Sequence, residues 1–544
     1  RGNYPDPPKR IFINPRVCEG CGDCSVQSNC IAVEPIKTPL GPKRTVNQSS
    51  CNKDFSCTKG FCPSFVELDS PVIRKPDKTR IAEAEAAILK CVPEPEIPAL
   101  ADVRNIYVTG IGGLGVLTLG ALLGKAAELD GLSSTVLDFT GLAQKNGAVV
   151  SHVRLAPVTR QIHAVRIPDG MVDVLLAADA LVASSTGNLQ KLSVRRSAAV
   201  INTDEAPTAD NVQDVQFELP TGEAIRRISN AVSRDATFEV SLTSLADRIF
   251  GNTIASNIML LGYAWQKGLI PINRVSLIEA IKINGAAVAM NLRAFEWGRA
   301  IAQDPGAVEI LISNDDPEDI ARPWTKTRFA EELADYQDQA YADRYADIVG
   351  RVALACKAFG PDGAEIVRSV EQNAYKVMAY KDEYEVARLY ASADYRRALE
   401  KQFSDWKSVR VWLAPPSLNP FSKKGAPPRK RRFGPWVFAA FALLRSLKRL
   451  RGTPFDPFGL TAERRGERAL RDDYLDMVFD ITQRLTPANL NLAKQLVALP
   501  AEVRGYGHVK ERSVEQVRAR WQSLRREFDR TSKSTDVITD PARG

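Results

Sequence analysis

Cysteine is the residue type whose spacing carries the most chemistry in this sequence. Residues 18–30 read CEGCGDCSVQSNC and residues 51–63 read CNKDFSCTKGFCP, so seven of the nine cysteines lie between positions 18 and 62. Clustered thiols can form disulfides, bind zinc or hold iron–sulfur clusters. An odd number of clustered thiols in a long chain without a secretory signal disfavours a disulfide framework. Zinc sites usually take C-x2-C pairs that lie far apart in sequence, whereas here a third thiol follows the second by the same step.

The first run has the spacing of a bacterial ferredoxin. In that pattern C-x2-C-x2-C wraps a loop around one cluster, and the fourth thiol of the run reaches the neighbouring cluster. Gly20 and Gly22 suit this wrapping, because backbone amides must turn towards sulfide without a Cβ in the way. The sequence therefore favours iron–sulfur chemistry over zinc and over disulfides.

The two-cluster pattern indicates which side chains serve each site. One robust [4Fe–4S] cluster is expected on Cys18, Cys21, Cys24 and Cys62, the last of which is followed by proline as the pattern requires. The second cluster is expected on Cys30, Cys51, Cys57 and Asp54.

Asp54 breaks the repeat, because it keeps the ligand step with a carboxylate in place of a thiolate. An oxygen ligand holds iron less firmly than sulfur does, so we expect a labile cluster that interconverts between four-iron and three-iron forms. Alternatively, Asp54 caps a turn, and the site holds three irons or none.

A glycine-rich turn follows the cysteine region. The sequence NIYVTGIGGLGV predicts a strand that leads into this turn, then a helix over 116–128 and a second strand that ends at Asp138. The glycines are Gly110, Gly112, Gly113 and Gly115. Such a βαβ start is typical of dinucleotide binding, with phosphate at the helix N-terminus and an acidic residue at a ribose. The same glycines also allow close packing of helix and strand in any α/β domain.

The next segment, GLAQKNGAVVSHVR, has a polar centre followed by a predicted strand. Its reactive-looking side chains are Gln144, Lys145, Asn146, His152 and Arg154. His152 is one of only three histidines, which invites a catalytic role, although a hydrogen-bonded structural histidine is the commoner outcome. For His508, within RGYGHVKE, a tight turn with a satisfied imidazole is favoured over ligand binding.

Composition bounds the class of protein. The chain has 544 residues, 44% of them hydrophobic and 25% charged, which is typical of a globular protein with three or four domains. No apolar run approaches the roughly 18 residues of a membrane helix, and the first residues do not resemble a secretory signal. The formal charge of +8 is concentrated near residues 416–435, in a segment typical of a solvated linker. We therefore expect a soluble, cytoplasmic protein that binds neither nucleic acid nor membrane.

The pattern along the chain predicts a multidomain fold, α/β followed by α. The expected parts are a ferredoxin-like module with two iron–sulfur clusters at 1–75, a linker at 76–104, a Rossmann-like α/β domain at 105–310, a helical region at 311–415, a basic linker at 416–435, a second helical region at 436–535 and a tail at 536–544. Residues 236–270 and 276–300 are expected to form helices that cover the sheet.

Several segments together resemble a known family. The cysteine region, GIGGLGV, GLAQKNGAVVSHVR, FDPFGLTAERRGER and RGYGHVKE are similar to the C-terminal half of single-chain indolepyruvate ferredoxin oxidoreductases, in the same order and over almost the whole chain. The resemblance implies that 105–310 is the γ-type domain of 2-oxoacid:acceptor oxidoreductases. It further implies oxidative decarboxylation of an aryl 2-oxoacid on thiamine diphosphate, electron transfer through the clusters to ferredoxin, and CoA as the acceptor of the acyl group.

One departure from that family is large. Nothing in the sequence resembles the GDG-containing segment that binds Mg²⁺ and the diphosphate of thiamine, so the thiamine domains are expected upstream of Arg1 or on another chain. The expected partners are then those domains, ferredoxin and a second copy of this chain, and no catalytic residue is assigned. Two alternatives remain: an NAD(P)-linked iron–sulfur oxidoreductase, which the glycine turn and Asp138 favour, and a non-enzymatic electron-transfer subunit.

Overall fold

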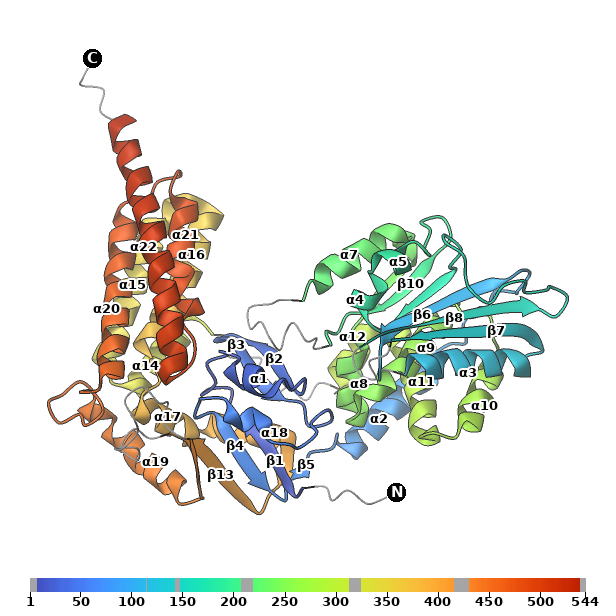
Figure 1. The fold of residues 1–544 in the computed structure, drawn as a ribbon, viewed down its shortest axis with the longest axis horizontal. Coiled ribbons are helices and arrows are strands. Elements are labelled where there is room, and N and C mark those ends of the chain that lie inside the picture. Colours follow the sequence, from blue (N-terminus) through green and yellow to red (C-terminus); the bar gives the residue numbers. More distant parts are fainter. Residues whose placement is uncertain are drawn as a thin grey trace. The chain divides into compact units, whose positions relative to one another are not determined.

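The structure, a computed structural model, describes residues 7–113, 115–141, 147–206, 219–312, 324–414 and 430–538. Its contacts separate two compact units (Figure 1). Unit 1 holds the described residues of Arg1–Arg74 and Asp315–Gly544, and unit 2 holds those of Lys75–Thr208 and Phe217–Asn314. Among the described helices, none combines the length and the apolar character that crossing a membrane requires.

A six-stranded sheet forms the centre of unit 2. Its strands are β6 (Arg104–Ile111), β7 (Leu132–Thr140), β8 (Ala148–Pro157), β9 (Val174–Ala177), β10 (Ala198–Asn202) and β11 (Thr237–Val240). They lie in the order β11-β10-β9-β6-β8-β7 (Figure 1). The strands from β11 to β6 are parallel, whereas β8 runs antiparallel to β6, and β7 runs antiparallel to β8. Strands β9 and β10 are buried along their whole length, as the continuous apolar runs of parallel strands require.

Helices cover both faces of this sheet. Along β6, Ile106 and Val108 join one hydrophobic core and Tyr107 joins the other, because successive side chains of a strand point to opposite faces. The first core is completed by α3 (Val116–Leu129), α8 (Leu242–Phe250), α9 (Ser256–Gln266), α10 (Arg274–Asn284) and α11 (Val288–Gln303). The second is completed by α4 (Ala180–Ala183) and α7 (Thr221–Ala231). The remaining elements of unit 2 are α2 (Lys78–Ile88), α5 (Thr186–Leu189), α12 (Pro305–Ile312) and the 3-10 turns η2 (Leu89–Cys91), η3 (Arg234–Ala236) and η4 (Thr253–Ala255).

Helices α9 and α11 approach each other through a reciprocal pair of glycines. A Cβ on Gly262 would lie 2.1 Å from the carbonyl oxygen of Phe295, and a Cβ on Gly298 would lie 2.1 Å from that of Met259. Any larger side chain would push the helices apart, so these glycines set the separation of the two most buried helices of the unit.

Unit 1 builds its main sheet from strands that are distant in sequence. The antiparallel order is β1 (Lys9–Ile13), β4 (Phe65–Asp69), β13 (Ser408–Leu413) and β14 (Arg431–Phe433). Strands β2 (Val33–Thr38) and β3 (Gly41–Val46) form a hairpin, and β5 (Val72–Ile73) pairs with β12 (Phe403–Asp405). The short helix α1 (Asp23–Ser28) and the 3-10 turn η1 (Ser56–Lys59) lie within the cysteine region.

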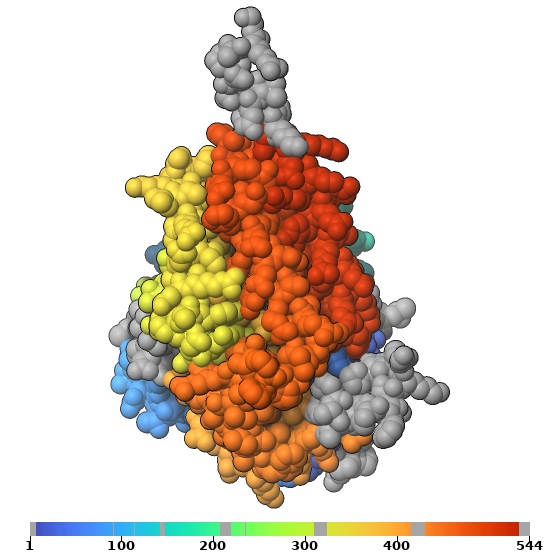
Figure 2. All heavy atoms as spheres, turned by 90° about the vertical axis from the view of Figure 1, so that its left-hand side faces the viewer, coloured from blue at the N-terminus to red at the C-terminus, as the bar shows by residue number. Residues whose placement is uncertain are grey.

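The rest of unit 1 is helical. One core is shared by α14 (Lys326–Tyr336), α15 (Gln339–Cys356), α16 (Gly360–Met378), α20 (Ala462–Gln483), α21 (Leu490–Ala498) and α22 (Gly507–Ile538). Figure 2 shows this bundle from the outside, from α15 in yellow through α20 in orange to α22 in red. A second core joins the main sheet to α17 (Glu383–Tyr390), α18 (Ala393–Gln402) and α19 (Val437–Ser446). The 3-10 turns are η5 (Lys357–Phe359), η7 (Leu447–Leu450) and η8 (Leu499–Glu502).

The structure differs from the sequence-based expectations in four places. Within the helix expected over 236–270, Thr237–Val240 forms strand β11, which pairs with β10. The expected linker at 76–104 contains α2, whose Ile81 and Ala84 pack into the core of unit 2. The expected helical region at 311–415 contains β12 and β13, because the cysteine region leaves the edge of β4 free to pair. The described end of the basic linker forms β14, which extends the same sheet.

Candidate functional site

Four thiols of the cysteine region line one hollow in unit 1. Cys18, Cys21, Cys24 and Cys62 border a space of about 310 Å³, together with Arg44 and Phe61. The backbone N–H of Gly20 donates a hydrogen bond to Cys18 Sγ at 3.3 Å, and Cys62 Sγ lies 2.9 Å from Ser64 Oγ. The structure thus brings together the four side chains that the sequence predicted for the first cluster.

Glycines fix the loop that carries these thiols. Gly20 and Gly22 have φ of 65° and 72°, which L side chains rarely adopt. A Cβ on Gly20 would lie 2.0 Å from the carbonyl oxygen of Pro42, and one on Gly60 would lie 2.7 Å from Cys24 Cα. The loop can therefore close around the hollow only where side chains are absent.

Cys30, Cys51 and Cys57 form a second group of thiols. They share one hydrophobic cluster with Cys18, Cys24 and Cys62 of the first set. Burial raises the pKa of Cys57 to about 12, with a further increase from the neighbouring Cys30 and Cys51 and from Asp54. The three thiols predicted for the second cluster are thus close enough to act on one another electrostatically.

Asp54 is exposed and takes part in a local turn. Its Oδ1 accepts hydrogen bonds from the backbone N–H of Ser56 at 2.9 Å and from Ser56 Oγ at 2.8 Å, and these bonds lower its pKa. The carboxylate also raises the pKa of Cys30 and of Cys57. Asp54 therefore caps its turn, as one of the two alternatives expected. Ligation of iron by Asp54 stays a prediction.

The first set of thiols fits an iron–sulfur cluster in its chemistry. Burial raises the pKa of Cys21 and of Cys24, and the neighbouring Cys62 raises both further. Four thiolates in this hollow would therefore require positive charge between them, which the irons of a cluster supply. In a cubane each thiolate binds a different iron, so the sulfurs surround a volume and do not meet at one point. In the described part of the chain, no three His, Cys, Asp or Glu side chains are grouped as ligands of a single metal ion, and the thiols form no disulfide.

Lys430 places one ammonium near both sets of thiols. Its Nζ donates hydrogen bonds to the carbonyl oxygens of Thr58 at 3.1 Å and Gly60 at 2.7 Å, and lies 4.2 Å from the centre of the Phe65 ring. Burial lowers the pKa of Lys430, while Cys62, Cys24 and Cys57 oppose that shift. The sequence analysis treated this residue as part of a solvated linker and missed its position.

A buried ion pair connects the first thiol set to the helical part of unit 1. Lys381 Nζ contacts the carboxylate of Glu19 and lies 3.4 Å from the carbonyl oxygen of Cys18. Burial alone would raise the pKa of Glu19, but Lys381 and Lys43 hold it well below its usual range. Glu19 is therefore a fixed negative charge next to a thiol.

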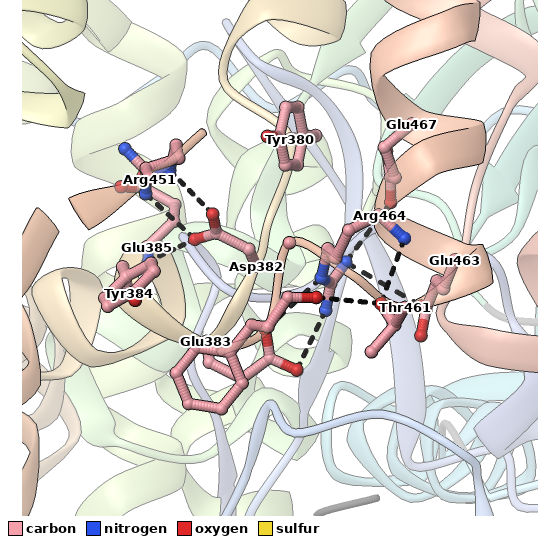
Figure 3. Close-up of polar contacts among 12 residues, drawn as sticks. Tyr380, Asp382, Glu383, Tyr384, Glu385, Arg451, Thr461, Glu463, Arg464 and Glu467 are labelled. Atoms are coloured by element: carbon pink, nitrogen blue, oxygen red, sulfur yellow. Dashed lines mark hydrogen bonds and ion pairs between the residues drawn. The ribbon is translucent and has the colours of Figure 1, made fainter. Parts of the chain in front are cut away.

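The segment that carries Lys381 is held by two arginines, shown in Figure 3. Arg451 Nε lies 2.6 Å from Asp382 Oδ2, and both side chains are only 4% exposed. Arg464 lies among the carboxylates of Glu383, Glu463 and Glu467, with the first at 3.2 Å (Figure 3).

The same contacts bring together segments that are far apart in sequence. Arg464 belongs to FDPFGLTAERRGER, and Lys510 belongs to RGYGHVKE. Lys510 Nζ contacts both carboxylate oxygens of Glu467 at 2.8 Å. His508, in the second segment, packs its ring against Phe61 with the ring centres 4.8 Å apart. The role of Lys381–Glu385 was not predicted from the sequence. The available signal was the charged run KDEYE, which stands at the start of helix α17.

The glycine turn of unit 2 is built for close packing. Gly115 has φ of 74°, and a Cβ there would lie 2.0 Å from Asn257 Nδ2. A Cβ on Gly110 would lie 2.8 Å from a methyl carbon of Val116. The backbone N–H of Gly112 donates to Gly147 O at 2.8 Å, and Gly113 has open space around its Cα.

The strand order separates Asp138 from this turn. Strand β8 lies between β6 and β7, so β7 is not the neighbour of β6 that a dinucleotide-binding βαβ unit requires. Asp138 is exposed on the edge strand, opposite Ser151 of β8. Asp138 and the glycine turn therefore lie one strand further apart than they do in a dinucleotide-binding βαβ unit.

His152 is a structural histidine. Its Nδ1 accepts a hydrogen bond from the backbone N–H of Ile167 at 3.1 Å, and its ring packs against Tyr107 and Phe139. Burial lowers its pKa to about 4, and the nearby Lys191 and Arg166 lower it further. Arg154 is held by Asn105 and by the carbonyl oxygen of Ala164. Gln144, Lys145 and Asn146 lie outside the described residues.

Comparisons with known proteins match two parts of the chain. Residues 105–301 match the family described as pyruvate ferredoxin/flavodoxin oxidoreductase, and residues 326–523 match DUF6537, a family of unknown function. The indolepyruvate oxidoreductase subunit IorB of Methanothermobacter thermautotrophicus is 27% identical over 202 residues, which are 37% of this chain and 98% of the relative. The subunit of the same name from Pyrococcus horikoshii is 28% identical over 207 residues, 37% of this chain and 96% of the relative.

Solved structures of low sequence identity also match. Pyruvate oxidoreductase subunit PORC of Thermotoga maritima is 17% identical with a TM-score of 0.26, over 36% of this chain and 96% of that one. The 2-oxoglutarate:ferredoxin oxidoreductase of Magnetococcus marinus is 19% identical with a TM-score of 0.29, over 40% of this chain and 32% of that one.

His152 predicts a pH-dependent stability for this chain. Its pKa is about 4 in the folded protein, below the ordinary value near 6.5 of an unfolded chain. Between these values the unfolded chain binds more protons, so the unfolding free energy should fall as the pH drops from about 6.5 to about 4. The loss should reach roughly 2–3 kcal/mol.

Urea unfolding over this pH range measures the effect. The variant His152→Gln should lose most of the slope, whereas His163→Gln, a change at an exposed histidine, should keep it. Equal slopes for the two variants would contradict the assignment of the slope to His152.

Proposed function

We propose that this member of the 2-oxoacid:ferredoxin oxidoreductase family, which carries the γ-type portion, also supplies the electron relay of an indolepyruvate or other arylpyruvate oxidoreductase. One observation carries the relay: Cys18, Cys21, Cys24 and Cys62 line a single buried hollow. The likeness of 37% of the chain to the IorB subunits supports the oxoacid half of the proposal.

The two thiol sets would hold the cofactors. The first would hold a [4Fe–4S] cluster, and Cys30, Cys51, Cys57 and Asp54 would hold a [4Fe–4S] or [3Fe–4S] cluster. When bound, these clusters accept electrons singly at low potential, which suits the stepwise oxidation of a decarboxylated oxoacid. The chain's own part is to bury the thiols, to keep water from them with side chains such as Ile13 and Phe65, and to hold Lys430 beside them.

The proposal requires further components. Thiamine diphosphate and Mg²⁺ would bind to domains outside this sequence, CoA would take the acyl group, and ferredoxin would take the electrons. A second copy of the chain is the expected partner in assembly. The segment resemblance and the description of the relatives as subunits support these expectations.

The NAD(P)-linked alternative has less support. The position of β8 between β6 and β7 separates Asp138 from the strand that leads into the glycine turn. A non-enzymatic electron-transfer subunit would use the same thiol sets, so activity is needed to distinguish it.

Activity with separately supplied thiamine domains tests the proposed function. The chain alone, purified without oxygen and given thiamine diphosphate, should not oxidise indolepyruvate or phenylpyruvate. Addition of thiamine-binding domains should produce viologen reduction, and Cys24→Ser should abolish it because one buried ligand of the first set is lost. Turnover by the chain alone would sink the proposal. Intact clusters without any restored activity would favour the electron-transfer subunit.

Asp54 generates a second prediction for the relay. If Asp54 binds iron, mild oxidation of the parent should give the electron paramagnetic resonance signal of a three-iron cluster, because oxygen holds that iron weakly. Asp54→Cys should remove the signal, and Asp54→Ala, which also lacks a thiolate, should keep it. Identical signals in the parent and Asp54→Cys would show that Asp54 only caps its turn.

A further inference from the structure

A second hollow in unit 1 lies outside both thiol sets. Its lining borders about 800 Å³ of space, part of which is open solvent. The tip of the β2–β3 hairpin, α14, α16, α17 and the residues just before α22 contribute its walls. These elements come from both ends of the sequence, so the hollow exists only in the folded unit.

Five cationic side chains line this hollow: Arg16, Lys43, Lys376, Lys381 and Arg504. Two of them are neutralised within the protein. Arg16 lies 2.8 Å from a carboxylate oxygen of Glu332, and Lys381 contacts Glu19.

The other three cations have no carboxylate within ion-pair distance among the described residues. Lys376 Nζ and Arg504 Nε donate to the same carbonyl oxygen, that of Ala501, at 3.0 Å and 2.9 Å. Lys43 is only 6% exposed, and its ammonium makes no hydrogen bond within the described part of the chain. A buried ammonium without such partners is costly, so this wall is poised for a ligand that brings negative charge.

The electrostatics agree with the geometry. Burial lowers the pKa of Lys376 to about 7; Glu19 opposes this shift, and Lys43 and Arg504 add to it. Burial is thus the main cause of the shift, and a bound anion would stabilise the charged form of Lys376.

Part of the lining is apolar and aromatic. Phe329, Tyr375 and Leu389 are buried there, and Leu40 is half-buried. The rings of Phe329 and Tyr375 are 4.8 Å apart. Such a surface suits a flat or apolar group, because aromatic faces stack well on other rings.

We propose that this hollow binds a phosphorylated organic anion. Its phosphate or diphosphate group would contact Lys43, Lys376 and Arg504, and its ring or apolar part would rest on Phe329 and Tyr375. Three cations without a carboxylate partner carry more positive charge than a ligand with a single carboxylate would neutralise. A guanidinium beside two ammonium groups also matches the many acceptor oxygens of a phosphate group. None of these residues is a proposed iron ligand, so the inference does not depend on the clusters.

Calorimetry on the full chain tests the proposal with inorganic pyrophosphate, ADP and benzoate as probes. Pyrophosphate and ADP should bind, and benzoate should bind at least 10-fold more weakly. Lys376→Gln and Arg504→Gln should each weaken pyrophosphate at least 10-fold. Tyr375→Leu should weaken ADP while leaving pyrophosphate nearly unchanged, because only the ring would lose its support.

Arg351→Gln is the matched control, since it removes a cation from the same helical bundle that is exposed and paired with Asp347. Lys376 and Arg504 are both half-buried. Each is replaced in a separate variant, so that a folding defect in one leaves the other as a test, and circular dichroism checks the folding of each. Absence of binding by both phosphate probes, or equal weakening by Lys376→Gln and Arg351→Gln, would overturn the proposal.

Discussion

Crowding thiols into a buried hollow is the constraint on which the arrangement of unit 1 depends. Burial and the neighbouring sulfurs raise the pKa of Cys21 and of Cys24, so thiolates can persist there only beside positive charge. The chain places cations near them from remote segments: Lys430 donates to backbone oxygens between the two thiol sets, and Lys381 pairs with Glu19 beside Cys18. The cysteine region and the C-terminal half of the sequence are therefore coupled electrostatically, and the pairing of β13 with β4 joins the same two parts through the backbone.

The layer of ion pairs behind Lys381 follows from the same constraint. Arg451 and Arg464 hold Asp382 and Glu383, the two residues that follow Lys381. Buried ion pairs add little net stability compared with apolar packing of the same volume, because both charges lose their hydration. These ion pairs lie within residues 326–523, which match a family of unknown function. We infer that they fix the position of the charges next to the thiols.

Sequence reasoning succeeded where the determinants are local. Three of the four thiols of the first set lie within seven residues, so their spacing alone indicated a shared site. The helices over 236–270 and 276–300 were predicted from their apolar runs, and α8 to α11 confirm this from Leu242 on, whereas Thr237–Val240 forms strand β11 of the sheet instead. Strand order could not be predicted, because nothing in the residues of β8 shows that it separates β6 from β7. Lys430 and Lys381 were missed because their partners are more than 360 residues away, and charged residues in such segments are usually solvent-facing.

We propose that two distinct thiol sets in unit 1 each hold an iron–sulfur cluster. The most direct test is the iron and sulfide content of the anaerobically purified chain, with electron paramagnetic resonance of the reduced protein, compared with its Cys24→Ser variant. We expect about seven or eight irons with matching sulfide in the parent, and a variant that loses about four irons while the signal of the second cluster persists. Zinc without sulfide, or an iron content that Cys24→Ser leaves unchanged, would contradict it.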